Sequence, residues 1–149
     1  MKFRPILFVA VLSMIVLSGC KKYENGGLVS KAEKRLSGTQ WKLDKYLWNG
    51  TDQTSTLLIT NYVETYNDGG AYTRSYNDSN GDPFSETGSW AFNSDKMSLD
   101  IGSVSSLPLT PQNSTVSATK YDVLRLKKDE FWYTFTNGGD THEFRFVPN

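Results

Sequence analysis

Histidine and cysteine are nearly absent from this chain. Its 149 residues include one of each, His142 and Cys20. A lone cysteine cannot form an internal disulfide, so the fold has to be stabilised by its core. One histidine and one cysteine cannot supply the soft ligands of a zinc-type cluster. The sequence therefore predicts no metal centre and no other cofactor.

Catalytic motifs are missing as well. The sequence contains no Gly-x-Ser-x-Gly motif, and nothing in it pairs His142 with the nucleophile and orienting group that a general base requires. His142 alternates in register with Phe144 and Phe146, which favours a structural or surface histidine. We expect a protein that is not an enzyme.

An excess of charge of one sign is also lacking. Lys and Arg together number 16, as do Asp and Glu, and the formal net charge at pH 7 is zero. A chain without a basic field is a poor partner for nucleic acid, and electrostatics alone do not attach it to a membrane.

The only long apolar run lies at the N-terminus. Residues 6–16 are apolar except for Ser13, and Lys2 and Arg4 precede them. A positive segment, a short apolar run and small residues are typical of a secretory signal peptide, and the run is shorter than the roughly 20 residues of a membrane span. We predict that residues 1–19 are a signal peptide. Without Lys2 and Arg4, the remaining acidic residues outnumber the basic ones by two.

Cys20 lies at the boundary between the apolar run and the polar chain. The sequence Leu17-Ser18-Gly19-Cys20 resembles the lipobox of bacterial lipoproteins, in which the cysteine thiol is acylated and the chain is cut just before it. The resemblance implies that Cys20 carries a diacylglyceryl group and acyl chains such as palmitate, which hold the protein at the membrane. The alternatives are an ordinary secretory peptide with a chance cysteine and an uncleaved anchor.

The residue after the cysteine bears on localisation. Lys21 does not resemble the aspartate signal that retains some lipoproteins at the inner membrane. We expect a lipid-anchored protein of the bacterial cell envelope, at the outer membrane, on its periplasmic face or on the cell surface.

Three segments follow along the chain. Residues 20–29 are mostly polar and include Gly26-Gly27, which is typical of a flexible lipidated tether. Ser30 and Glu33 have the spacing of a capping box, and Gly38 is placed to end a helix, so we predict a helix over roughly 30–37. Residues 30–149 form the predicted domain.

From Thr39 onward the apolar residues alternate with polar ones, and turn residues separate the runs. Trp41, Leu43 and Leu47 share the inner face of the first run, which Lys45 interrupts. Asn49-Gly50 ends it. The predicted strands are the segment from Thr39 to that turn and residues 57–66, 71–77, 86–92, 96–101, 116–127, 131–136 and 141–147. The pattern predicts an all-β, antiparallel, up-and-down barrel of about eight strands after one short helix.

Two connections need separate comment. Gly102 to Thr119 is long and rich in Ser, Thr and Pro, and connections of this length are usually functional or disordered. Asp78, Asn80 and Asp82 have the alternate oxygen spacing of a calcium loop, but Pro83 and Ser89 stand where an EF-hand needs Gly and Glu. We predict a hairpin turn on Asn80-Gly81.

Several short motifs resemble the bacterial lipocalin-like domains. Gly38 and Trp41 follow the predicted helix as the glycine and tryptophan that begin the family's first strand, one residue wider than the Gly-x-Trp of true lipocalins. The motifs Asn67-Asp-Gly-Gly-Ala-Tyr72, Gly88-Ser-Trp90 and Met97-Ser-Leu99 fit its later hairpins. The resemblance implies a lipocalin-like barrel. It leaves two places for Arg145: stacked on Trp41 by a cation–π contact, or exposed beside Glu143.

The inner face of the predicted strands carries many aromatic residues. An eight-stranded barrel has room for one small molecule, although small barrels are commonly filled by their own side chains. Both outcomes stay open at this point. The candidate ligand-binding residues are Tyr72, Tyr76, Trp90, Phe92 and Tyr133.

We expect a membrane-anchored protein that binds a small hydrophobic or amphipathic ligand. The alternative is a non-enzymatic interaction subunit that docks on an envelope protein, or a glycan-binding module.

The anchor is tested by Cys20→Ala in the full-length chain. Because the thiol is the acylated group, the variant should lose labelling by radioactive palmitate and move from the detergent phase to the aqueous phase. A variant that partitions with membranes like the wild type would contradict the lipobox assignment.

Overall fold

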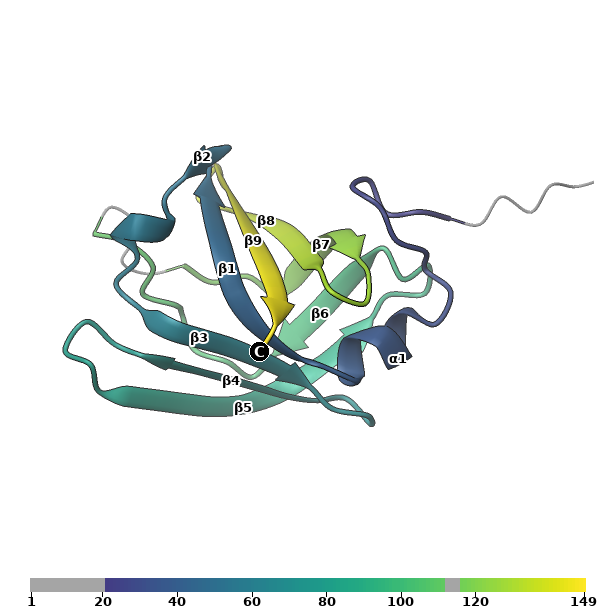
Figure 1. Ribbon diagram of the computed structural model, residues 1–149, viewed down its shortest axis with the longest axis horizontal. Coiled ribbons are helices and arrows are strands. Elements are labelled where there is room, and N and C mark those ends of the chain that lie inside the picture. The colour runs from purple at the N-terminus through teal and green to yellow at the C-terminus, as the bar shows by residue number, and fades with distance from the viewer. Residues whose placement is uncertain (1–20, 112–115) are drawn as a thin grey trace, which may run out of the picture.

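A computed structural model describes residues 21–111 and 116–149 (Figure 1). The elements are α1 (Ala32–Ser37), β1 (Gln40–Trp48), β2 (Thr51–Asp52), the 3-10 turn η1 (Thr54–Thr56), β3 (Thr60–Tyr66), β4 (Ala71–Asn77), β5 (Pro83–Phe92), β6 (Ser98–Gly102), β7 (Lys120–Leu126), β8 (Phe131–Asn137) and β9 (Asp140–Pro148). In this part of the chain, no helix has the length and apolarity to cross a membrane. The predicted signal peptide and Cys20 lie outside the described residues.

The sheet closes on itself. Neighbours pair antiparallel in the order β1-β3-β4-β5-β6-β7-β8-β9, and β1 also pairs with β9. This last pairing runs from Trp41 opposite Pro148 to Trp48 opposite His142, so the strands form a closed barrel of eight, with β2 as a short arm on β1. The predicted antiparallel up-and-down barrel is confirmed.

Alternation decides which side chains face inward, and one bulge changes it. In β4, Tyr72, Arg74 and Tyr76 are buried while the residues between them are not. In β1 the register shifts between Leu43 and Lys45, where a bulge adds a residue to one strand. Tyr46, which is fully buried, therefore faces inward in place of Leu47. The predicted shared face of the first strand is wrong at its last member.

The helix covers one end of the barrel (Figure 1). Ala32 and Leu36 are fully buried, and the indole of fully buried Trp41 donates to the Leu36 carbonyl at 3.0 Å. The predicted capping box is wrong, because the N-cap is Lys31, in a left-handed conformation and without a side-chain cap. Glu33 instead pairs with Lys96 at 3.2 Å, which ties the helix to the turn between β5 and β6.

The segment before the helix packs on the same end of the barrel. Tyr23 is 2% exposed, and its hydroxyl donates to the Lys96 carbonyl at 2.9 Å. Gly27 has a φ of +101°, and a Cβ there would lie 2.2 Å from the Leu126 carbonyl oxygen. The prediction of a flexible tether is therefore wrong for the stretch from Tyr23 to Gly27. The buried tyrosine and the close approach of the Gly27 backbone to Leu126 fix this stretch on the barrel.

The long connection between β6 and β7 covers the opposite end. We call its described parts, residues 103–111 and 116–119, the strap. Leu107 and Val116 pair in a β-bridge, with N–O distances of 2.7 and 3.0 Å. Leu107, Leu109 and Val116 are buried, and the Leu58 amide donates to the Leu109 carbonyl at 2.7 Å. The described parts of this connection are thus ordered and close the barrel.

The packing at the helix end predicts a large loss of stability for Trp41→Ala. Removing a buried tryptophan leaves a cavity, so the free energy of unfolding in urea should fall by about 3–5 kcal/mol. Trp132→Ala is the matched control, because Trp132 lies half-buried on the outer face of β8. It should cost about 1 kcal/mol. Equal losses would mean that Trp41 does not close the barrel.

Candidate functional site

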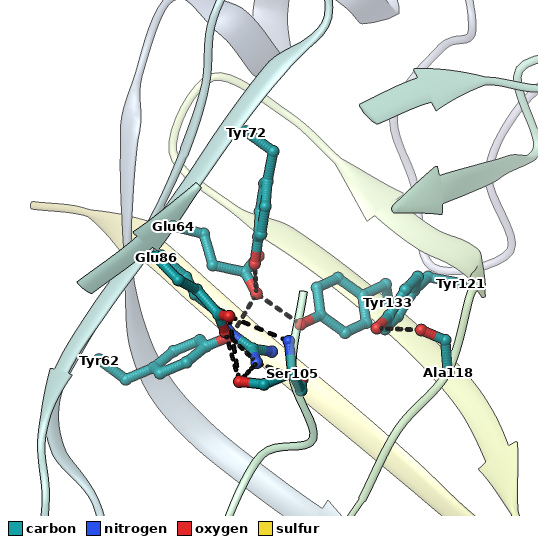
Figure 2. Close-up of polar contacts among 9 residues, drawn as sticks. Tyr62, Glu64, Tyr72, Glu86, Ser105, Ala118, Tyr121 and Tyr133 are labelled. Carbon is teal, nitrogen blue, oxygen red and sulfur yellow. Dashed lines mark hydrogen bonds and ion pairs between the residues drawn. The ribbon is translucent and has the colours of Figure 1, made fainter. Parts of the chain in front are cut away.

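A buried carboxylate occupies the barrel interior. Glu64, on β3, is 1% exposed. Four tyrosine hydroxyls donate to it: those of Tyr62, Tyr72 and Tyr133 to Oε1 at 2.6, 2.9 and 2.8 Å, and that of Tyr66 to Oε2 at 2.5 Å. Figure 2 shows Tyr62, Tyr72 and Tyr133 converging on this side chain from three strands. A carboxylate is an acceptor with about four lone-pair sites, so these hydroxyls satisfy it.

A cross-strand ladder of charge continues from this carboxylate. Arg74 on β4 lies opposite Glu64 where β4 pairs with β3. It lies opposite Glu86 where β4 pairs with β5. Arg74 is 4% exposed and pairs with Glu86 through both Nε and Nη2. The inward faces of three adjacent strands thus carry a negative, a positive and a negative group.

The strap is bound to this ladder by Ser105. Its backbone amide donates to the Glu86 carboxylate at 3.0 Å, its hydroxyl lies 3.0 Å from the same group, and its carbonyl accepts from Arg74 (Figure 2). Burial alone would raise the pKa of Glu86, but its pKa is lowered, because the Ser105 amide and Arg74 favour the charged carboxylate. The charged groups of the interior therefore also hold the strap.

Little free volume is left around these groups. The cavity between the tyrosines, Arg74 and the strap measures about 10 Å³. One water molecule needs roughly 10–15 Å³ by this measure. With the strap in this position, the barrel is filled by its own side chains.

The five candidate ligand-binding residues do not share one cavity. Tyr72 and Tyr133 lie in the interior network. Tyr76 stacks on Phe84 at 4.8 Å, toward the far end of the β4–β5 hairpin. Trp90 and Phe92 line a separate pocket of about 270 Å³ beside the β3–β4 turn, together with Glu33 and Asp68. Their role in binding stays a prediction.

The only histidine is part of the core. His142 is fully buried and stacks on Phe135 at 5.1 Å, and its Nδ1 lies 2.8 Å from the Tyr46 hydroxyl. Burial lowers the pKa of His142, and Asp140 opposes this shift. Of the structural and surface positions that the sequence pattern allowed for His142, the structure shows the structural one.

The acidic loop between β4 and β5 is a hairpin turn, as predicted. The Asp78 carboxylate accepts the backbone amides of Asn80 and Asp82 at 2.8 and 2.9 Å. Within residues 21–111 and 116–149, no group of three or more His, Cys, Asp and Glu side chains is arranged to hold a metal ion.

Comparison with solved structures identifies the fold. A lipocalin-like protein from Bacteroides uniformis superposes with a TM-score of 0.52 at 13% identity, over 77% of this chain and 99% of that one. The fold is lipocalin-like. An uncharacterized protein from Bacteroides eggerthii gives 0.45 at 16% identity, over 72% and 96% of the two chains. Cholesterol-bound japanin from Rhipicephalus appendiculatus gives 0.45 at 10%, over 76% of each. No family model and no curated protein matches the sequence.

In this lipocalin-like barrel, Gly38 ends α1 and Trp41 lies beneath it, packed on Phe131 at 5.5 Å. Arg145 lies beside Glu143, as in the second of its two expected places, but it is half-buried and not exposed. It donates to Glu143 at 2.7 Å, and its guanidinium lies 4.2 Å from the centre of the Trp132 ring on the outer face. Stacking of Arg145 on Trp41 is therefore wrong, because alternation in β9 turns Arg145 away from the interior.

The sequence interpretation missed Glu64, Arg74 and Glu86. The signal was present, since Glu64 alternates with Tyr62 and Tyr66, and Arg74 alternates with Tyr72 and Tyr76. A charged residue within an inward-facing aromatic series marks a buried polar group that needs partners.

The tyrosines predict an unusual alkaline titration. Burial raises the pKa of Tyr62, Tyr66, Tyr72 and Tyr133 well above 10, and Glu64 raises it further. Stability from these groups is complete below the unfolded pKa of 10 and is lost as the pH rises toward the folded values. Phenolate absorbance should therefore appear only with loss of the β circular dichroism signal.

Glu64→Gln removes the negative charge that, together with burial, raises the pKa of these tyrosines. Phenolate absorbance of this variant should therefore appear at lower pH than in the wild type. Glu130→Gln, in a surface pair with Arg125, is the control and should titrate like the wild type. Several tyrosines ionising near pH 10 in the intact fold would show that the interior is open to water.

Proposed function

We propose that this chain is a membrane-anchored lipoprotein whose barrel binds a small hydrophobic or amphipathic ligand at the end covered by the strap. The observation that carries the proposal is the set of charged and hydroxyl groups buried directly beneath the strap. Binding sites of this kind are mostly apolar and contain a few convergent polar groups. An eight-stranded barrel is also the size that holds one small ligand.

Stability alone gives little reason for these groups. A buried ion pair is often no more stabilising than apolar side chains of the same volume, because both charges lose their hydration. Arg74 and Glu86 nevertheless occupy inward positions that apolar residues fill elsewhere in the barrel. A role in recognising the polar part of a ligand accounts for their presence.

The strap supplies the route to the interior. Its contacts with the barrel include the Ser105 bonds to Arg74 and Glu86, the Leu58–Leu109 hydrogen bond and the burial of three apolar side chains. A ligand that provides apolar surface and a polar atom would replace these contacts in kind. The 10 Å³ cavity would then open only when the strap moves.

The filled interior also fits the alternative, a non-enzymatic interaction subunit. Such a subunit would be expected to present an apolar docking face. Among the described residues, the only large hydrophobic side chain that is strongly exposed is Phe84, at 38%. We therefore place ligand binding first.

Anchoring is proposed from the sequence motif alone. Acylation of Cys20 would hold the barrel at the outer membrane of the cell envelope, three residues from the buried Tyr23.

Ligand binding is tested with residues 21–149 and the neutral fluorescent probe phenylnaphthylamine. We expect saturable binding at one site per chain, with slow association because the strap has to open. Glu86→Gln weakens the bonds to Ser105 and should speed association several-fold.

Glu130→Gln is the matched control, because it breaks a comparable arginine–glutamate pair on the outer surface. It should leave the association rate unchanged. Absence of saturable binding to the wild type would contradict a ligand-binding barrel and favour the interaction subunit.

A further inference from the structure

Two buried nitrogen atoms at the strap end have no hydrogen-bond partner. They are Nε1 of Trp48 and Nε2 of His142. The two residues are directly opposite each other on β1 and β9, and facing residues of an antiparallel pair share one side of the sheet. His142 is fully buried, and Trp48 packs against the core. A buried polar atom without a partner costs about 1–3 kcal/mol, so two of them on facing residues require an explanation.

Hydrogen-bond counting fixes the chemistry of this pair. The indole Nε1–H of Trp48 is a donor only. If the Tyr46 hydroxyl donates to His142 Nδ1, the neutral ring carries its hydrogen on Nε2. The reverse tautomer would leave the Tyr46 hydroxyl hydrogen unpaired as well as Nε2, since Nδ1 is the partner of that hydroxyl. The first arrangement leaves fewer unpaired groups, so both orphan atoms are N–H donors.

We infer that Trp48 and His142 bind an uncharged oxygen acceptor of the ligand, such as the carbonyl of a ketone or ester. The inference rests on the proposed function and specifies the ligand class. Because this pair offers two N–H donors and no acceptor, it favours a ligand oxygen that can accept hydrogen bonds with two lone pairs.

Charge in the interior argues for a neutral acceptor. Glu64 and Glu86 outnumber Arg74, and Asp140 is the charged group that acts on His142. A carboxylate ligand would meet this net negative charge. A carbonyl oxygen would accept both hydrogen bonds without that repulsion.

The test is a thermodynamic cycle on residues 21–149 with two probes of the same shape, acetylnaphthalene and ethylnaphthalene. They differ by a carbonyl oxygen, and the ratio of their dissociation constants is compared between wild type and variants. Because hydration of the free probes cancels in this comparison, the change in ratio reports the contact itself. Trp48→Phe and His142→Phe should each lower the relative preference for the ketone about threefold to tenfold.

Trp132→Phe is the matched control, because it makes the same chemical change on the outer face and should leave the ratio unchanged. Nitrogen-15 NMR adds a readout that does not depend on affinity. In the free protein His142 should carry its hydrogen on Nε2, and the ketone should shift the Trp48 indole resonance.

The outcomes separate the two proposals. If both probes bind and the ratio is the same in all variants, a bound water satisfies the donors and the inference is overturned while ligand binding stands. A hydrogen on Nδ1 of His142 would overturn it equally. If neither probe binds saturably, the proposed function and the inference fall together.

Discussion

The need to satisfy one buried carboxylate shapes the interior of this barrel. Glu64 faces inward because it alternates with tyrosines on β3, and an unpaired charge at that position would be strongly destabilising. The donors come from β3, β4 and β8, so the hydrogen bonds cross the barrel and connect walls that are far apart along the sheet. Each hydroxyl has to lie at a fixed depth. The network thus sets the spacing of the walls as well as satisfying the charge.

The two ends of the barrel are closed in different ways. At the helix end, Trp41, Leu36 and Ala32 pack as an apolar plug, with the one polar atom of the indole bonded to a carbonyl. At the other end, the strap makes polar bonds to Arg74 and Glu86 alongside its apolar contacts. Polar bonds can be exchanged for water or for a ligand at little net cost, whereas an apolar plug cannot be withdrawn without exposing its surface. This asymmetry supports the proposed ligand access at the strap end.

Much of the fold could be predicted because its signals are local. Alternation and Asn-Gly turns specify the hairpins, and consecutive hairpins specify the barrel. The bulge after Leu43 could not be predicted, since it depends on pairing with β9, about a hundred residues away. Tyr23 looked like part of a tether because its neighbours are polar, and its burial involves a hydrogen bond to Lys96, 73 residues away. Glu64 and Arg74 each interrupt an inward-facing series of tyrosines, which is a local signal of a buried charge, but their partners come from other strands.

The docking of Tyr23 has a consequence for orientation. Tyr23 is the third residue after Cys20, and an extended chain covers about 10 Å over that distance. With a lipid on Cys20, as proposed, the linker between the membrane and the barrel would be too short for the barrel to tumble freely. Tyr23 bonds to Lys96, which pairs with Glu33 of α1, so it lies at the end that carries α1. That end would face the lipid headgroups, and the strap would point into the aqueous compartment, so ligands would be exchanged with solution and not with the bilayer.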